Sequence, residues 1–127
     1  MASQVTAAFA VPNGALIEVS VSCDGIVAFN ILVSKLIGGQ WVAQAPLAQS
    51  VVVHGTPASF TLPALAAGDT VLLTVPYVET SVTSGQPVST TITITAAGKT
   101  EGKVTTSPVT PTDGQAGKDT LFIELEA

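Results

Sequence analysis

Two side chains of this 127-residue chain have the chemistry of a catalytic base or nucleophile: the single histidine, His54, and the single cysteine, Cys23. A histidine can act as a base near neutral pH, and Ser50 or Ser59 with Asp69 would supply the other members of a serine triad. No serine, however, lies in the Gly-x-Ser-x-Gly pattern that exposes a nucleophile at a sharp turn. Cys23 ends an alternating apolar run, which is typical of a small buried side chain. We therefore expect no catalytic residues and a protein that is not an enzyme.

Two short segments have features of ligand-binding loops. Gly98-Lys99-Thr100 matches the end of a phosphate-binding loop, but Thr93 stands where that loop needs its first glycine. Residues 113–119 combine two aspartates with glycines, but they lack the further oxygen ligands and the closing Glu of a calcium loop. A structural zinc site needs about four Cys or His ligands, more than the chain contains. We expect no cofactor and no metal, and we interpret both segments as turns.

The charge balance argues against binding to nucleic acid. The net charge is -5, and the only cations are four lysines, Lys35, Lys99, Lys103 and Lys118. Because phosphate binding depends on clustered Lys and Arg, these scattered lysines do not predict a nucleic-acid partner. No apolar run approaches the ~20 residues that span a bilayer, and residues 1–5 do not resemble a secretory signal. We expect no membrane partner and folding in a reducing cytosol.

Apolar and polar residues alternate with period two along most of the chain, which is typical of β-strands with one buried face. Seventeen valines and seventeen threonines strengthen this interpretation, because β-branched side chains suit a pleated sheet. We predict one all-β domain over residues 1–127, an antiparallel β-sandwich of about eight to ten strands. The sequence leaves an immunoglobulin-like and a jelly-roll arrangement open. The expected strands are 3–11, 15–23, 26–36, 40–45, 49–54, 58–62, 70–77, 90–97, 102–106 and 119–126.

Turn signals between these runs suggest how the strands connect. Asn13-Gly14, Asp24-Gly25 and Gly38-Gly39 can adopt the positive φ of tight hairpins, so the first four strands are expected to form an antiparallel meander. A further hairpin is expected over residues 98–101. The Ser/Thr-rich stretches 79–89 and 105–119 are expected to be long exposed loops.

Three apolar residues do not fit a single buried face. Phe122 and Leu72 are out of phase with the core positions of their strands, and Trp41 follows the Gly38-Gly39 turn. Two interpretations are open for each residue. It is part of a second buried face or an isolated apolar residue on the surface, or it contacts another subunit. Phe122, Leu72 and Trp41 are therefore the candidate subunit-interface residues.

The surface composition favours a protein that works in an assembly. Only 10% of residues are charged, against ~25% in typical domains, while 46% are hydrophobic. Charges keep monomers apart, and obligate interfaces are more apolar than ordinary surface. We therefore infer a structural protein that packs against neighbours.

The segment Phe60-Thr61-Leu62-Pro63-Ala64-Leu65-Ala66-Ala67-Gly68-Asp69-Thr70-Val71, within a short acidic Ala/Thr/Val/Gly-rich chain, carries a resemblance. The chain resembles the small β-sandwich proteins that decorate or cement the capsids of tailed phages. This resemblance implies a virion protein, assembled in the host cytoplasm, that bridges subunits of the major capsid protein as a homo-oligomer, commonly a trimer. The same segment resembles the loop-and-strand pattern of bacterial Ig-like modules. That alternative implies an adhesion or carbohydrate-binding module whose Ser/Thr-rich loops, 79–89 and 105–119, carry recognition.

Overall fold

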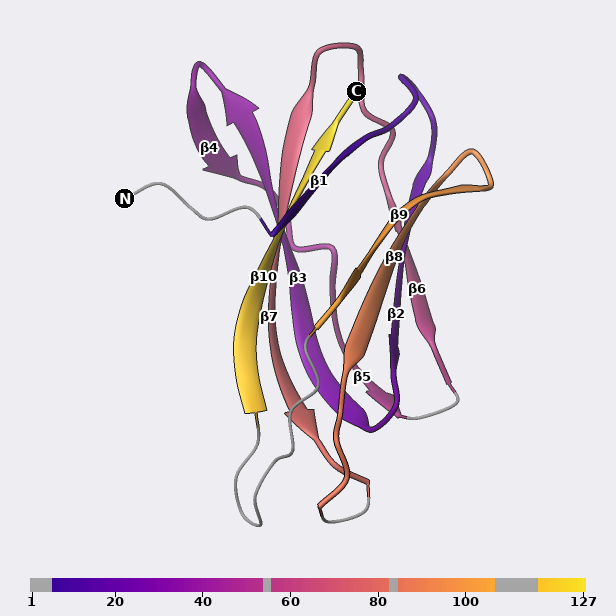
Figure 1. Ribbon diagram of the computed structural model, residues 1–127. Helices are drawn as coiled ribbons and strands as arrows, with labels where there is room; N and C mark the ends of the chain where they lie inside the picture. Colours follow the sequence, from indigo (N-terminus) through magenta and orange to yellow (C-terminus); the bar gives the residue numbers. More distant parts are fainter. Residues whose placement is uncertain (1–5, 54–55, 83–84, 107–116) are drawn as a thin grey trace.

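The protein is a sandwich of two β-sheets (Figure 1). The computed structural model describes residues 6–53, 56–82, 85–106 and 117–127. The predicted all-β class is confirmed, and the sheets are mostly antiparallel. The strands are β1 (Ala7–Ala10), β2 (Ile17–Cys23), β3 (Ile26–Ile37), β4 (Gln40–Ala43), β5 (Ala48–Val53), β6 (Ala58–Leu62), β7 (Thr70–Thr80), β8 (Thr90–Ala96), β9 (Lys99–Thr105) and β10 (Gly117–Glu126).

The larger sheet has six strands in the order β1-β10-β7-β3-β4, with β5 also paired to β3. β4 and β5 lie on the same edge of β3 and run antiparallel to it, one after the other. They therefore act as two halves of one strand, interrupted at residues 44–47, where Pro46 lacks an N–H for the ladder. At the opposite edge, β1 runs parallel to β10.

The smaller sheet has four strands in the order β6-β2-β8-β9. β2 is central and pairs over its whole length, Ile17–Cys23, with β8. All neighbours in this sheet are antiparallel.

The core lies between the two sheets and follows from the alternation of the sequence. In β2 every second residue is buried, and in β8 the buried positions alternate with half-buried threonines. The aliphatic side chains Ile17, Ile31, Leu73, Ile94 and Ile123 are fully buried. Removing such side chains from water, at ~25 cal/mol per Å² of apolar surface, is the main force that holds the two layers together.

The predicted N-terminal meander is wrong in two of its three connections. β3 and β4 form the expected hairpin, with positive φ at Gly38 and Gly39. β1 and β2, and likewise β2 and β3, belong to different sheets. The chain therefore changes sheet at Asp24-Gly25 instead of turning back within one sheet.

Gly25 is required at this corner for space and not for a positive φ. A Cβ on Gly25 would lie 2.7 Å from the carbonyl oxygen of Thr80 and 2.9 Å from a methyl carbon of Val88. Asp24 fixes the same corner, because its Oδ1 accepts a hydrogen bond of 2.7 Å from the Ser89 N–H. A dipeptide that commonly marks a hairpin thus also fits a tight passage between two sheets.

The β8–β9 hairpin turns earlier than expected, at Ala97 and Gly98, which both have positive φ. The strand after the turn consequently starts at Lys99 and not at residue 102. The register of the two strands shifts between Ile94 and Thr95: Ile94 pairs with Gly102, whereas Thr95 pairs with Thr100. At Gly102 a Cβ would overlap the ring of Phe9, so this glycine lets β1 approach β9.

Candidate functional site: an apolar outer sheet face

The most distinctive surface is the face of the six-stranded sheet that is turned away from the four-stranded sheet, here called the outer face. Residues directly opposite each other in a sheet point to the same side, so the register identifies its members. Ala28 lies opposite Val78 on β7 and opposite Val51 on β5. The apolar members of the outer face are Ala28, Leu32, Leu36, Trp41, Val51, Val53, Leu72, Pro76, Val78 and Phe122.

Leu72 is the centre of this face. It lies directly opposite Ser34 and Glu124, and it is therefore diagonal to Leu32, Leu36 and Phe122. These neighbours explain why Leu72 is only 3% exposed although it is not part of the core between the sheets. Leu72 is thus a residue of the outer face whose side chain is covered by its neighbours.

Trp41 extends the same face onto the β3–β4 hairpin. It pairs with Leu36, and both side chains are more than a third exposed. On the opposite side of this hairpin Ile37 and Val42 are also exposed. The hairpin projects beyond the rest of the sheet, at the upper left of Figure 1. It therefore offers apolar side chains on both of its faces.

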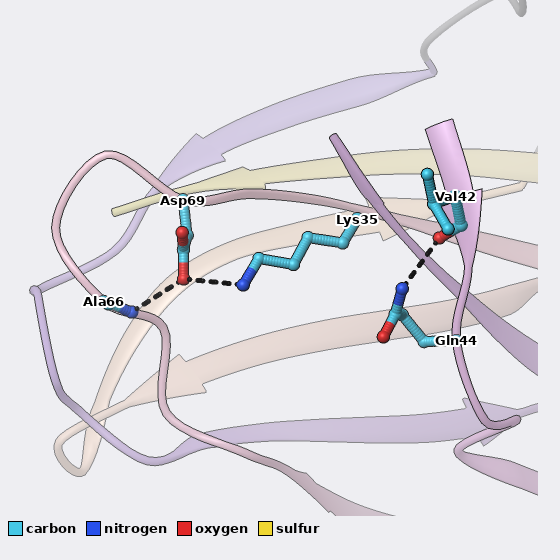
Figure 2. A network of polar contacts seen from close by, with 5 residues as sticks. All are labelled: Lys35, Val42, Gln44, Ala66 and Asp69. Atoms are coloured by element: carbon cyan, nitrogen blue, oxygen red, sulfur yellow. Dashed lines mark hydrogen bonds and ion pairs between the residues drawn. The ribbon is translucent and has the colours of Figure 1, made fainter. Parts of the chain in front are cut away.

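An ion pair fixes the base of the projecting hairpin. Lys35 Nζ lies 3.3 Å from Asp69 Oδ2, and the same oxygen accepts a hydrogen bond of 3.1 Å from the Ala66 N–H (Figure 2). Gln44 Nε2 donates to the Val42 carbonyl oxygen at 3.1 Å, where the chain leaves β4. Because Lys35 and Asp69 are partly exposed, their ion pair contributes at most about 1 kcal/mol. It links β3 to the loop before β7.

A shallow open groove of 820 Å³ runs along the other end of the outer face. Residues of β3, β5, β7 and β10 line it, and all of them are uncharged. Its lining residues are Ala28, Phe29, Asn30, Gln49, Ser50, Val51, Pro76, Tyr77, Val78 and Thr120.

The sequence-based candidates for a subunit contact converge on this face. Phe122, Leu72 and Trp41 come from three different strands, and the structure places all three on the outer face. Trp41 is exposed and Phe122 is half-buried, whereas Leu72 is covered within one chain. Leu72 therefore belongs to a locally buried second face, and the contact of Phe122 and Trp41 with another subunit stays a prediction.

A buried polar cluster lies at one end of the interior. Glu79 is 2% exposed, and its Oε2 accepts hydrogen bonds from Thr90 Oγ1 at 2.7 Å and from Thr106 Oγ1 at 3.1 Å. Thr106 Oγ1 in turn accepts a hydrogen bond of 2.9 Å from the Thr90 N–H. The cluster therefore ties β7, β8 and the end of β9 together across the sandwich.

Sequence reasoning missed this cluster because it assigned stretches 79–89 and 105–119 to exposed loops. β7 continues to Thr80, and β10 starts at Gly117. The alternation in β7 indicates that Glu79 is buried, because Glu79 continues the series of core positions Leu73, Val75 and Tyr77. A carboxyl group in core phase indicates a buried polar partner.

The other chemical candidates are dispersed. Cys23 is buried, accepts a hydrogen bond of 3.3 Å from the Gly25 N–H, and lies 3.6 Å from Thr90 Oγ1. His54 and residues 113–116 of the candidate calcium loop lie outside the described residues. Lys99 and Thr100 lie in β9, so the phosphate-loop match is part of a hairpin.

Within the described ranges, no three His, Cys, Asp or Glu side chains gather where they could hold a metal ion. The same part of the chain contains no helix with the length and apolar character needed to cross a membrane.

The comparisons with known proteins give no match for this chain among family models, curated proteins or solved structures.

Proposed function

We propose that this protein is a non-enzymatic structural subunit of a virion, which decorates or cements a phage capsid by binding the major capsid protein through its outer face. The observation that supports this proposal is the concentration of apolar side chains on that face. Leu32, Val51 and Val78 are each at least 40% exposed there. Exposed apolar patches of this kind commonly mark sites of protein contact.

The size of the outer face suits a partner that is itself a protein. Four strands abreast, spaced ~4.8 Å apart, over about ten residues of ~3.3 Å each, give a face of roughly 20 Å by 30 Å. This is about 600 Å², close to the ~800 Å² that each partner buries in a standard interface. The projecting β3–β4 hairpin adds to this area and can reach a second coat subunit.

The distribution of charge favours close packing on this face. Among its described side chains, the charged ones are Glu124 and Glu126, both on β10. The central strands β7 and β3 present apolar, hydroxyl and amide side chains to the outside, and none of them is charged. A coat partner is therefore expected to present an apolar surface with a positive margin opposite β10.

Binding to capsids tests this proposal directly. Empty shells are assembled from the coat protein encoded in the same genome and are sedimented with the purified protein. The wild-type protein is expected to co-sediment in a fixed ratio to the coat protein, and Leu32→Lys or Trp41→Lys to reduce this binding about tenfold or more, because each buries an unpaired charge.

The matched control is Leu16→Lys. Leu16 is 66% exposed and precedes β2 in the other sheet, so its substitution is expected to leave binding unchanged. A wild-type protein that never sediments with shells, or equal loss in all three variants, would contradict the proposal.

A further inference from the structure

The open edges of the two sheets differ in how well they are protected against pairing with another strand. Unprotected edges pair readily with further strands, and proteins block them with charges, prolines, bulges or short length. β9 carries Lys99, Glu101 and Lys103 and contains the register shift. β6 lies between Pro57 and Pro63. β1 and β4 have only four residues each.

β5 has none of these protections. Its six residues, Ala48–Val53, contain no charge and no proline and end in three valines. Among the described strands it pairs with β3 alone. Val51 and Val53 are 58% and 49% exposed. β5 is therefore the edge best suited to accept another strand.

The backbone of β5 has identifiable groups that point away from β3. The Thr56 N–H donates to the Val53 carbonyl oxygen at 3.0 Å, and Thr56 lies beyond β5 and outside β3. The peptide groups of successive residues in a strand alternate in direction. The N–H and C=O groups of Val51 and Gln49 therefore also point to the open edge, while Val53 is already engaged by the turn.

We propose that β5 pairs antiparallel with β5 of a second copy of this chain, about a twofold axis through Ser50. In this register Gln49 of each copy lies opposite Val51 of the other, which gives four backbone hydrogen bonds and leaves the Val53–Thr56 bridge intact. Side chains that face each other in an antiparallel pair point to the same side. The two outer faces consequently join into one continuous face.

An identical strand satisfies this edge better than an unrelated one, because antiparallel self-pairing is closed by its own symmetry and leaves neither β5 edge open. Pairing through β5 does not depend on capsid binding. It gives a dimer, whereas the resemblance to decoration proteins implies a trimer. Sedimentation of the purified full chain therefore separates the two expectations.

Analytical ultracentrifugation from micromolar to submillimolar concentration is the first test. The wild-type protein is expected to show a concentration-dependent monomer–dimer equilibrium. Val51→Lys places a charge at the paired edge, and it should raise the dimer dissociation constant about tenfold or more. Leu16→Lys and Val82→Lys replace apolar residues of similar exposure elsewhere, and they should leave that constant unchanged.

A crosslinking test reports the register and does not depend on the lysine variants. Ser50 lies on the axis as a pair without direct hydrogen bonds, with an expected Cα–Cα separation of ~4.5 Å, which a disulfide can bridge. Ser50→Cys is therefore expected to form a disulfide-linked dimer on mild oxidation, and Val82→Cys is not. A wild-type protein that stays monomeric or forms trimers, or a Ser50→Cys variant that crosslinks no more than Val82→Cys, would overturn the proposal.

Discussion

Replacing Thr106 by valine tests the buried cluster around Glu79 with little change in shape. The Thr106 hydroxyl makes two hydrogen bonds, one donated to Glu79 Oε2 and one accepted from the Thr90 N–H. Thr90→Val removes a hydroxyl that donates to Glu79 Oε2 and lies 3.6 Å from the weak acceptor Cys23 Sγ, but it leaves the Thr90 N–H paired with Thr106. Only Thr106→Val therefore leaves a buried backbone N–H without its acceptor.

The expected free-energy losses follow from that difference. Leaving one buried polar group without its partner costs ~1–3 kcal/mol. Thr90→Val should lower the free energy of unfolding by about 2 kcal/mol, since Glu79 loses one donor. Thr106→Val should lower it by about 3–4 kcal/mol, because Glu79 loses a donor and the buried Thr90 N–H loses its acceptor.

Equilibrium unfolding in urea measures these losses, with the slope m used to check that the unfolded state is unchanged. Thr105→Val is the matched control. Thr105 is exposed, and its hydroxyl pairs only weakly, at 3.1 Å, with that of Thr91. Its substitution should change stability by less than about 0.5 kcal/mol. Equal losses at Thr105 and Thr106, or a larger loss for Thr90→Val than for Thr106→Val, would refute the assignment of this cluster as a structural link.

Two further predictions concern close approaches between strands and loops. Gly102→Ala should lower the free energy of unfolding by about 1–3 kcal/mol because its Cβ overlaps the Phe9 ring; Phe9→Leu should reduce this loss in a double-mutant cycle, and an additive result would contradict the contact. Asp69→Ala should destabilise more than Lys35→Met in the same urea assay, because Asp69 Oδ2 also accepts the Ala66 N–H. The Lys35→Met loss should stay below about 1 kcal/mol and shrink at high salt; a loss that salt does not reduce would count against the ion pair.

The positions of the strands were predictable from sequence because alternation is a local property of side chains. All ten expected strands overlap an observed strand, including the short β6 at residues 58–62. Pairing was much less predictable, since it depends on which runs meet in space. Asp24-Gly25 shows the reason: one dipeptide serves a hairpin or a change of sheet, and the distinction at Gly25 comes from Thr80 and Val88, far away in sequence.

The candidate surface was partly predictable for the same reason. Phe122 and Leu72 stood out because they broke the phase of their strands, and both lie on the outer face. The burial of Leu72 depends on diagonal neighbours from β3 and β10, which only the register reveals. Glu79 was missed because the end of its strand was placed too early.

The central position of β10 has a consequence for synthesis of the chain. β10 is synthesised after the other nine described strands, yet it is inserted between β1 and β7. Until residues 117–126 emerge, β1 lacks the strand with which it pairs among the described residues, and β7 exposes the peptide groups that later bond to β10. Such long-range pairing slows folding. The nascent polypeptide therefore passes through a stage in which the position between β1 and β7 is open to a strand of another nascent chain, and slower translation of residues 117–126 would prolong that stage.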